Sequence, residues 1–237
     1  MQKILPRDEL LGQQFSAAIS GDAAELAKKS ARVYMKNMTQ YKCAMMDIEG
    51  RFKLLNEEYV LEHGRAPISS IKTRVKSIPS IKEKLERKEY PVSFDSAIDN
   101  LDDIAGVRVI CSFPDDVNTM AEALLRQDDI SLVKKRDYIT NPKANGYRSL
   151  HLVVTTPIYL SNEKKQIKVE IQLRTIAMDF WASLEHELRY KSDADFTEEM
   201  ADELLECAQL SADLDNRMAE LRKKCFRRTY CERGYKK

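Results

Sequence analysis

Apolar side chains recur at alternating steps of four and three residues along the first quarter of the chain. Positions 30–62 contain no proline and one glycine, Gly50. This spacing gathers the apolar side chains on one face of a long α-helix, and His63 followed by Gly64 predicts its end. A shorter helix is predicted over residues 9–19. The members of the apolar stripe are Tyr34, Met38, Tyr41, Met45, Ile48, Phe52, Leu55 and Tyr59.

A second stripe with the same steps lies near the C-terminus. Its members are Met200, Leu204, Cys207, Ser211, Leu214, Met218 and Leu221. A period near 3.5 residues is typical of helices that pack along one another. Two interpretations stay open: this helix covers the core of its own domain, or it contacts another subunit. The residues after Leu221 are strongly basic, which predicts a solvated tail.

The central part of the chain alternates between predicted strands and predicted helices. The last strand has the clearest period of two, with Glu170, Gln172 and Arg174 on its polar face. Strands mixed with helices in this way predict an α+β domain, a mixed sheet flanked by helices. Strands are predicted over 107–113, 130–138, 150–160 with an interruption at Pro157, and 166–174, and helices over 117–126 and 175–190.

Composition narrows the class of protein. Of the 237 residues, 43% are hydrophobic, which is enough to fill a core. Lysine and arginine (39) balance aspartate and glutamate (38), and this excludes a globally basic nucleic-acid binder. The chain has no apolar run long enough to span a membrane, and its first residues lack the apolar stretch of a signal peptide. Scattered cysteines without a CxxC pair favour a reducing cytoplasm, with Cys225 and Cys231 as free thiols.

Two stretches are suited to phosphates and metal. A basic run over 65–88 is dense enough to neutralise a polyphosphate, although the commoner explanation of such a run is a solvated helix face. Asp103 stands just before a predicted buried strand, and Arg108 follows five residues later. An oxygen ligand for a metal beside a phosphate or base contact fits this pair; a simple turn aspartate is the alternative.

Two further stretches complete the candidate chemistry. The residues 136–151 form a predicted loop, because they contain Asn141-Pro142 and Asn145-Gly146. Its cations and Tyr147 can hold phosphates and stack on a base. If the polar face of the last strand lines a cleft, Glu170 and Asp103 can hold Mg²⁺ across neighbouring strands. The sequence has no glycine-rich phosphate loop, neither GxxxxGK[ST] nor GxGxxG.

The order and spacing of these motifs resemble the synthetase domain of RelA/SpoT-type alarmone synthetases. The resemblance covers residues 65–192. It implies a nucleotidyltransferase-like mixed sheet flanked by helices, with a helical N-terminal extension over 1–64 and a C-terminal helix and basic tail over 193–237. The motifs that carry it are RVKSIPSIKEKL at 74–85, DIAGVRVIC at 103–111, RDYITNPKANGYRSLH at 136–151, VEIQLRT at 169–175 and FWASLEHELRYK at 180–191.

The resemblance implies a pyrophosphokinase that moves the β,γ-pyrophosphate of ATP onto the ribose 3′-oxygen of GDP or GTP and releases AMP. Asp103 and Glu170 are the implied catalytic residues and the ligands of Mg²⁺, with Glu170 as base for the 3′-hydroxyl. The implied ATP-binding residues are Arg74, Lys76, Lys84, Arg108 and Arg136, of which Arg74 and Arg108 enclose the adenine. The implied contacts of the acceptor nucleotide are Lys143, Asn145, His151 and Tyr147, which stacks on guanine.

The chain resembles the small, synthesis-only members of this family. None of its histidines precedes an aspartate, so the His-Asp pair of the hydrolase domain is not expected. This subgroup implies a bacterial, cytoplasmic homo-oligomer, a tetramer held by terminal helices, with no membrane partner. Two alternatives stay open: a toxic relative that pyrophosphorylates tRNA 3′ ends or adenine nucleotides, and a non-catalytic nucleotide- or RNA-binding module. RNA also stays open as a regulator, and GDP, GTP and GMP as acceptors.

Overall fold

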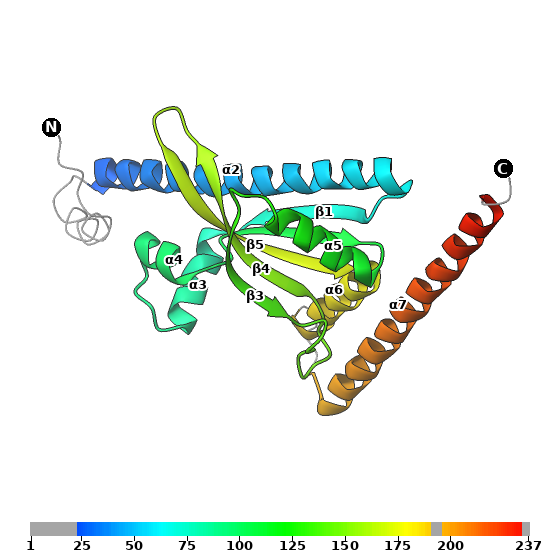
Figure 1. The fold of residues 1–237 in the computed structure, drawn as a ribbon. Coiled ribbons are helices and arrows are strands. Elements are labelled where there is room, and N and C mark those ends of the chain that lie inside the picture. The colour runs from blue at the N-terminus through cyan, green and yellow to red at the C-terminus, as the bar shows by residue number, and fades with distance from the viewer. Residues whose placement is uncertain (1–22, 191–195, 234–237) are drawn as a thin grey trace.

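A mixed five-stranded sheet forms the centre of the protein (Figure 1). The computed structural model describes residues 23–190 and 196–233, and their side chains over 32–189 and 196–225. The strand order is β1-β2-β5-β4-β3, in which β2 and β5 are parallel and the other neighbours antiparallel. The mixed sheet is therefore confirmed. The strands are β1 (Ile68–Val75), β2 (Ala105–Cys111), β3 (Ser131–Asp137), β4 (Leu150–Tyr159) and β5 (Lys164–Thr175).

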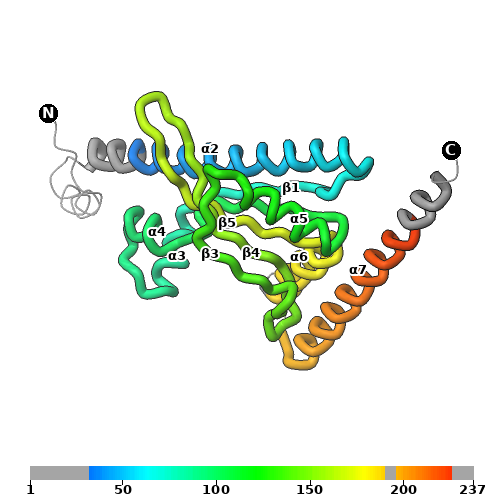
Figure 2. The backbone as a smooth tube through the Cα atoms, viewed as in Figure 1, coloured from blue at the N-terminus to red at the C-terminus, as the bar shows by residue number. Residues whose placement is uncertain are grey.

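Helices cover the sheet and extend from its two ends. The long helix α2 runs across one face and packs on β1, β2, β4 and β5, beside α5. Helices α3 and α4 lie at one end of the sheet, and α7 extends from the other (Figure 2). The helix predicted over residues 9–19 lies outside the described residues. The helices are α2 (Ala23–His63), α3 (Ile78–Arg87), α4 (Phe94–Asn100), α5 (Pro114–Leu125), α6 (Ile176–Tyr190) and α7 (Glu198–Arg233).

The apolar stripe of α2 lies in the main core. Tyr41, Met45, Ile48 and Phe52 are buried together with the apolar residues of β2, β4 and β5. The predicted helix is therefore confirmed, and α2 shares one core with the sheet. The apolar stripe of α7 differs, because Leu214, Met218 and Leu221 are about half exposed. Among the described side chains of α7, the buried ones are Ala208, Asp215 and Ala219.

The structure adds one strand that was not predicted and corrects one prediction. The first half of the basic run forms the strand β1, and the structure places a helix, α3, only from Ile78 onward. The strand β4 is not interrupted at Pro157, which is buried and pairs with Gln166. The reason is that β3 pairs with β4 only up to Thr155. Beyond that residue β4 is an edge strand on one side, where a proline without an N–H group is tolerated.

The described helices contain no segment with the length and apolar character needed to cross a bilayer. The thiols of Cys43, Cys111 and Cys207 are free, and Cys225 is exposed. Cys231 lies outside the described side chains.

Candidate active site

Polar side chains share the face of the sheet that lies opposite α2. Residues directly opposite each other on neighbouring strands point to the same face. Arg108 on β2 is paired with Lys72 on β1 and with Gln172 on β5. Gln172 is paired with His151 on β4, which is paired with Arg136 on β3. One row of polar side chains therefore crosses all five strands, and the next row contains Arg74 and Glu170.

A cavity of about 320 Å³ opens over β1, β2 and β5 on this face. It brings together five of the residues singled out in the sequence, at positions separated by as many as 96 residues along the chain, from Arg74 to Glu170. Its volume is within the usual range of small-molecule sites. The lining residues are Lys72, Thr73, Arg74, Lys76, Asp103, Gly106, Val107, Arg108, Glu170 and Gln172.

Asp103 lies between two lysines at one end of the cavity. Its Oδ2 is 2.9 Å from Nζ of Lys76 and 2.7 Å from Nζ of Lys84. Antiparallel pairing of β1 with β2 brings Lys76 to Asp103, while Ser77 caps the helix that carries Lys84. Burial raises the pKa of Asp103, but the hydrogen bonds and charges of Lys84 and Lys76 outweigh burial, so its pKa lies below the ordinary value. Its other oxygen, Oδ1, is buried with no hydrogen-bond partner.

Glu170 lies in the middle of β5, opposite Gly106 on the strand that follows Asp103. Its Oε2 accepts a hydrogen bond from Nε2 of Gln172 at 3.1 Å, and its Oε1 is 3.5 Å from Nδ1 of His151. Burial raises the pKa of Glu170, while His151 and Gln172 lower it further than burial raises it. The charge of Asp103 also acts on this pKa, so the two carboxylates are close enough to interact.

These two carboxylates fit a divalent cation. Both have lowered pKa values, so both are ionised at neutral pH, and Oδ1 of Asp103 is free of protein hydrogen bonds. Mg²⁺ is usually held by one or two carboxylates together with substrate phosphates and water. Within the described part of the chain, no cluster of three or more His, Cys, Asp and Glu side chains is arranged to hold a metal. Asp103 and Glu170 therefore suit a metal that arrives with phosphates.

Asp179, which sequence reasoning did not single out, gathers the cations at the other end of the site. Its Oδ2 is 2.9 Å from Nζ of Lys72, and its Oδ1 is 3.3 Å from Nη1 of Arg108 and of Arg174. Burial raises the pKa of Asp179, but Lys72, Arg108 and Arg174 lower it further. One carboxylate in the first turn of α6 thus pairs with cations from three strands, β1, β2 and β5.

Aromatic side chains lie next to this cation cluster, at the loop before β4. Tyr147 accepts a hydrogen bond from Nη2 of Arg174 at 2.6 Å, and its hydroxyl lies 2.8 Å from Nε2 of His151. The ammonium of Lys143 lies 4.8 Å from the centroid of the Tyr147 ring. The Asn145 side chain accepts from the backbone N–H of Tyr147 and donates to Glu185 on α6. His151 joins this group to Glu170.

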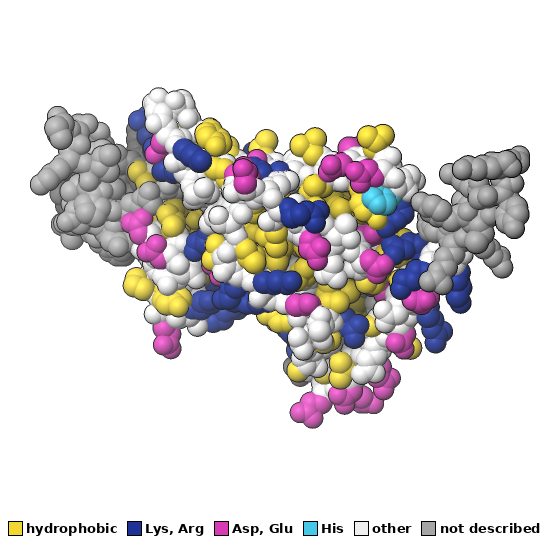
Figure 3. Space-filling model, viewed as in Figure 1, with side chains coloured by type: hydrophobic (Ala, Val, Ile, Leu, Met, Phe, Trp, Pro, Cys, Tyr) yellow, Lys and Arg dark blue, Asp and Glu magenta, His cyan; other side chains and the backbone are white. Residues whose placement is uncertain are grey.

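The structure thus gathers the predicted residues in two adjoining groups and leaves one apart. The first group surrounds the cavity and contains Asp103, Glu170, Arg74, Lys76, Arg108 and, through Asp103, Lys84. The second contains Lys143, Asn145, Tyr147 and His151. Arg136 lies on the exposed edge strand β3, outside the cavity lining. Lysine and arginine side chains gather over β3 and α3 (Figure 3).

Comparison with known proteins identifies relatives of the whole site region. The family described as "Region found in RelA / SpoT proteins" matches residues 73–195. GTP pyrophosphokinase YwaC of Bacillus subtilis (strain 168) is 45% identical over 183 residues, which are 77% of this chain and 87% of that protein.

Solved structures of small alarmone synthetases have a similar fold. Small alarmone synthetase 1 from Bacillus subtilis, bound to its product pppGpp, has a TM-score of 0.74 and 36% identity and covers 81% of this chain and 98% of its own. The same enzyme bound to AMPCPP has a TM-score of 0.69 and 33% identity, with 83% and 99% covered.

Proposed function

The chain belongs to the RelA/SpoT family, and on that premise we propose that it transfers the β,γ-pyrophosphate of ATP to the 3′-hydroxyl of GDP or GTP, releasing AMP. One observation carries the proposal most directly. Two ionised carboxylates, Asp103 and Glu170, lie in a cavity lined by cations, beside an aromatic group on the adjoining loop. The same reaction is supported by the relative named GTP pyrophosphokinase and by the small alarmone synthetase structures bound to pppGpp and to AMPCPP.

The cavity end near Asp103 is proposed as the ATP site. Arg74 and Arg108 lie on neighbouring strands and present the two planar guanidinium groups expected to enclose adenine. Lys76 and Lys84 both form ion pairs with Asp103. The triphosphate would replace the Asp103 carboxylate as the partner of their ammonium groups. Arg136 is proposed to reach the phosphates from β3, the edge of the same face.

The group around Tyr147 is proposed as the acceptor site. Tyr147 offers a ring for guanine, and Lys143, Asn145 and His151 surround it. His151 contacts both Tyr147 and Glu170, so an acceptor on Tyr147 places its ribose near the Glu170 carboxylate. The 3′-oxygen then bonds to the β-phosphorus, the bond to the α-phosphate oxygen breaks, and AMP leaves. Glu170 accepts the 3′-hydroxyl proton as that bond forms.

Mg²⁺ is proposed as the cofactor, held by Asp103 with help from Glu170. When bound, it neutralises charge that develops on the phosphate oxygens. Lys76 and Lys84, which contact Asp103, would share that task. Alignment and fixed charge account for most of the catalysis that phosphoryl-type transfer requires from a protein.

A homotetramer held by the terminal helices is proposed as the assembled state. The apolar residues of α7 at positions 210, 214, 218 and 221 are 49–67% exposed, and α2 exposes Met46, Leu54 and Leu61. Exposed stripes of this length favour contacts between subunits. The free thiols fit a reducing compartment, and we place the protein in the bacterial cytoplasm on that ground.

Product analysis by anion-exchange chromatography tests the reaction. The protein receives ATP, Mg²⁺ and, in separate tubes, GDP, GTP, GMP, ADP or deacylated tRNA. A guanosine tetra- or pentaphosphate formed with equimolar AMP supports the proposal. Transfer confined to tRNA or to adenine nucleotides contradicts it and favours the toxic relatives. Binding of both nucleotides without any turnover contradicts it in favour of a non-catalytic module.

A further inference from the structure

Helix α7 is packed directly against the acceptor loop. Gly146 has a φ of +85°, which only glycine adopts readily. A Cβ atom at this position would lie 2.5 Å from Cβ of Ala208 and 3.2 Å from Cδ1 of Leu205. The loop backbone and the helix therefore leave no room for a methyl group at this point. Because Gly146 directly precedes Tyr147, the position of α7 constrains the backbone that carries the aromatic ring.

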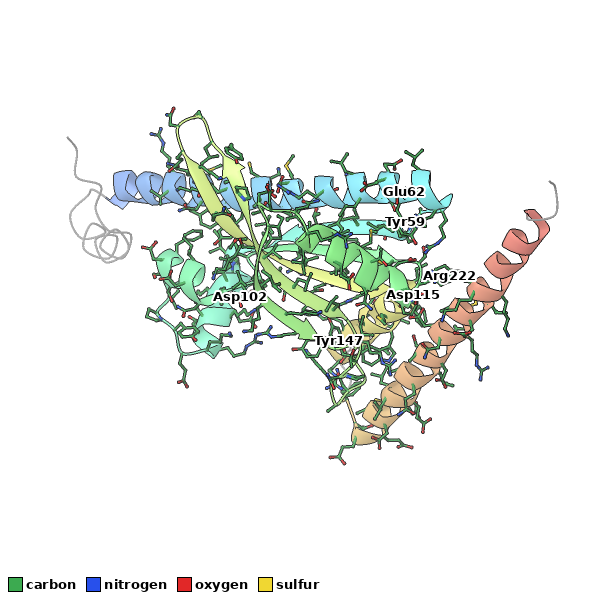
Figure 4. All side chains as sticks on the ribbon, viewed as in Figure 1. Tyr59, Glu62, Asp102, Asp115, Tyr147 and Arg222 are labelled. Atoms are coloured by element: carbon green, nitrogen blue, oxygen red, sulfur yellow. The ribbon has the colours of Figure 1, made fainter. Side chains whose placement is uncertain are left out.

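A buried aromatic cluster extends this contact to Tyr147 itself. Trp181 on α6 packs with Ala208, and Tyr147 packs against the pair. The indole Nε1 of Trp181 donates a hydrogen bond to the backbone oxygen of Leu204 at 2.9 Å. Figure 4 shows Tyr147 between the sheet and the lower part of α7. The wall behind the ring is thus formed by α6 and α7 together.

Asp215 makes a second contact between α7 and the site. Its Oδ2 accepts a 2.6 Å hydrogen bond from Oγ1 of Thr175. Oγ1 of Thr175 in turn accepts a hydrogen bond from the backbone N–H of Met178. Thr175 directly follows Arg174, which donates to the Tyr147 hydroxyl. Asp215 and Arg148 line the same small cavity beside Gly146. Asp215 is 7% exposed, so its contacts with β5 and the loop are shielded from water.

A separate contact at Arg222, farther along the helix, anchors α7 to α5. Arg222 pairs with Asp115 and Asp116 at the start of α5, and its guanidinium lies 4.6 Å from the centroid of the Phe113 ring. Figure 4 shows Arg222 and Asp115 side by side between the two helices. These contacts and those of Ala208 and Asp215 hold the stretch of α7 between them in a fixed position. A helix held in this way can serve as a rigid support for the loop.

We propose that Ala208 and Asp215 of α7 are positioning residues for the acceptor nucleotide, which act by fixing Tyr147 through Gly146, Arg148 and Thr175. This inference rests on the proposed function, because it takes the loop 145–148 as the acceptor site. Neither residue lines the cavity proposed for ATP. Their effect is therefore specific to one of the two substrates, whereas a general loss of stability would affect both.

Steady-state kinetics of three full-length variants test the proposal. Ala208→Leu pushes on the loop, and Asp215→Asn removes the charge but keeps an oxygen for Thr175. We expect the KM for GDP to rise about tenfold or more in both variants. The KM for ATP should stay within about twofold of the wild-type value. Gln209→Leu is the matched control, since Gln209 is exposed on the next position of α7 and should leave both KM values unchanged.

A rescue experiment separates positioning from folding. Gly146→Ala alone brings a methyl group onto Ala208 and strains a backbone with a φ of +85°, so it should raise the KM for GDP. Ala208→Gly in the same chain removes the contact with Ala208 but not the backbone strain, so it should lower the KM part of the way. Thermal unfolding followed by the fluorescence of Trp181, the single tryptophan, reports the fold of each variant. If Ala208→Leu does not fold, Asp215→Asn and the rescue pair decide. Equal changes in both KM values, no change in either, or no rescue overturn the inference. A wild-type protein that makes no guanosine product overturns the proposed function and this inference together.

Discussion

Replacement of Glu170 by glutamine tests the catalytic carboxylate with the least structural change. The amide has the same shape as the carboxylate and keeps an oxygen for the hydrogen bond from Gln172, which lies 3.1 Å away. It loses the charge near His151 and the ability to accept a proton. The groups proposed to hold the ATP phosphates, Lys76 and Lys84, contact Asp103 and not Glu170. ATP binding should therefore persist.

The size of the loss follows from the environment of Glu170. A general base contributes about 100- to 10 000-fold to a rate. The pKa of Glu170 lies below its ordinary value, so it is fully ionised at neutral pH but is a weak base, which favours the lower end of that range. Removal of one of two carboxylates proposed to hold Mg²⁺ adds about another tenfold. We expect kcat to fall about 1000-fold, or about 4 kcal/mol of transition-state stabilisation.

The assay is AMP release with GDP as acceptor, together with the affinity for a non-hydrolysable ATP analogue. Glu163→Gln on the turn between β4 and β5 is the control, because its carboxylate contacts the exposed Lys36 and Lys165 and lies outside the cavity lining. A Glu170→Gln protein with kcat within about threefold of the wild-type value would refute the role of Glu170 as base. A loss of ATP affinity equal to the loss of kcat would assign Glu170 to binding instead.

Three further predictions concern acceptor binding, the stability of the fold and the pH dependence of stability. Tyr147→Ala should raise the KM for GDP about 5- to 100-fold through lost stacking, with the KM for ATP unchanged, and Tyr147→Phe should show the smaller part due to the hydroxyl. Arg51→Met should lower the free energy of unfolding by about 1–2 kcal/mol in urea, because Arg51 joins α2 to Asp129 by two hydrogen bonds, whereas the exposed Arg32→Met should not. The folded protein lowers the pKa values of Asp103 and Glu170 from 3.8 and 4.5, so at acidic pH it binds fewer protons than the unfolded chain. The stability that these two groups contribute is fully present above about pH 4.5 and is lost as the pH falls through their folded pKa values. Urea unfolding at several pH values that shows no such loss would contradict the charge assignment.

Regular periodicity was sufficient to predict the elements that have one apolar and one polar face. The stripe of α2 and the alternation of β5 are of this kind, and both match the structure. The strand β1 was missed because it is an edge strand with a mostly exposed surface, so its sequence does not alternate. The pattern along α7 predicted the helix but did not show which face packs on the rest of the domain. Its inner face consists of small or polar residues, Ala208, Asp215 and Ala219, and a hydrophobic stripe does not detect close packing of small residues.

The candidate site shows the same division between local and distant information. The polar face of β5 and the motif around Asp103 indicated both carboxylates, and parallel pairing of β2 with β5 places them near each other. Asp179 gave no such signal, since an acidic residue in the first turn of a helix is ordinary. Its partners Arg108 and Lys72 lie 71 and 107 positions earlier in the chain, and only the fold brings them together.

The carboxylates of the site organise its cations before any nucleotide binds. Cations on neighbouring strands repel one another. The pKa of Arg108 is lowered mainly by burial and next by the charge of Arg174. Asp103 holds two lysines at the end proposed to bind ATP, and Asp179 holds Lys72 and two arginines toward the loop proposed to bind the acceptor. Phosphate oxygens accept hydrogen bonds from the same donors as carboxylate oxygens. In the proposed reaction, incoming phosphates would take the place of the carboxylates in an array of cations that is already fixed. Little reorganisation would be left for the moment of transfer, which is the condition under which electrostatic catalysis is strong.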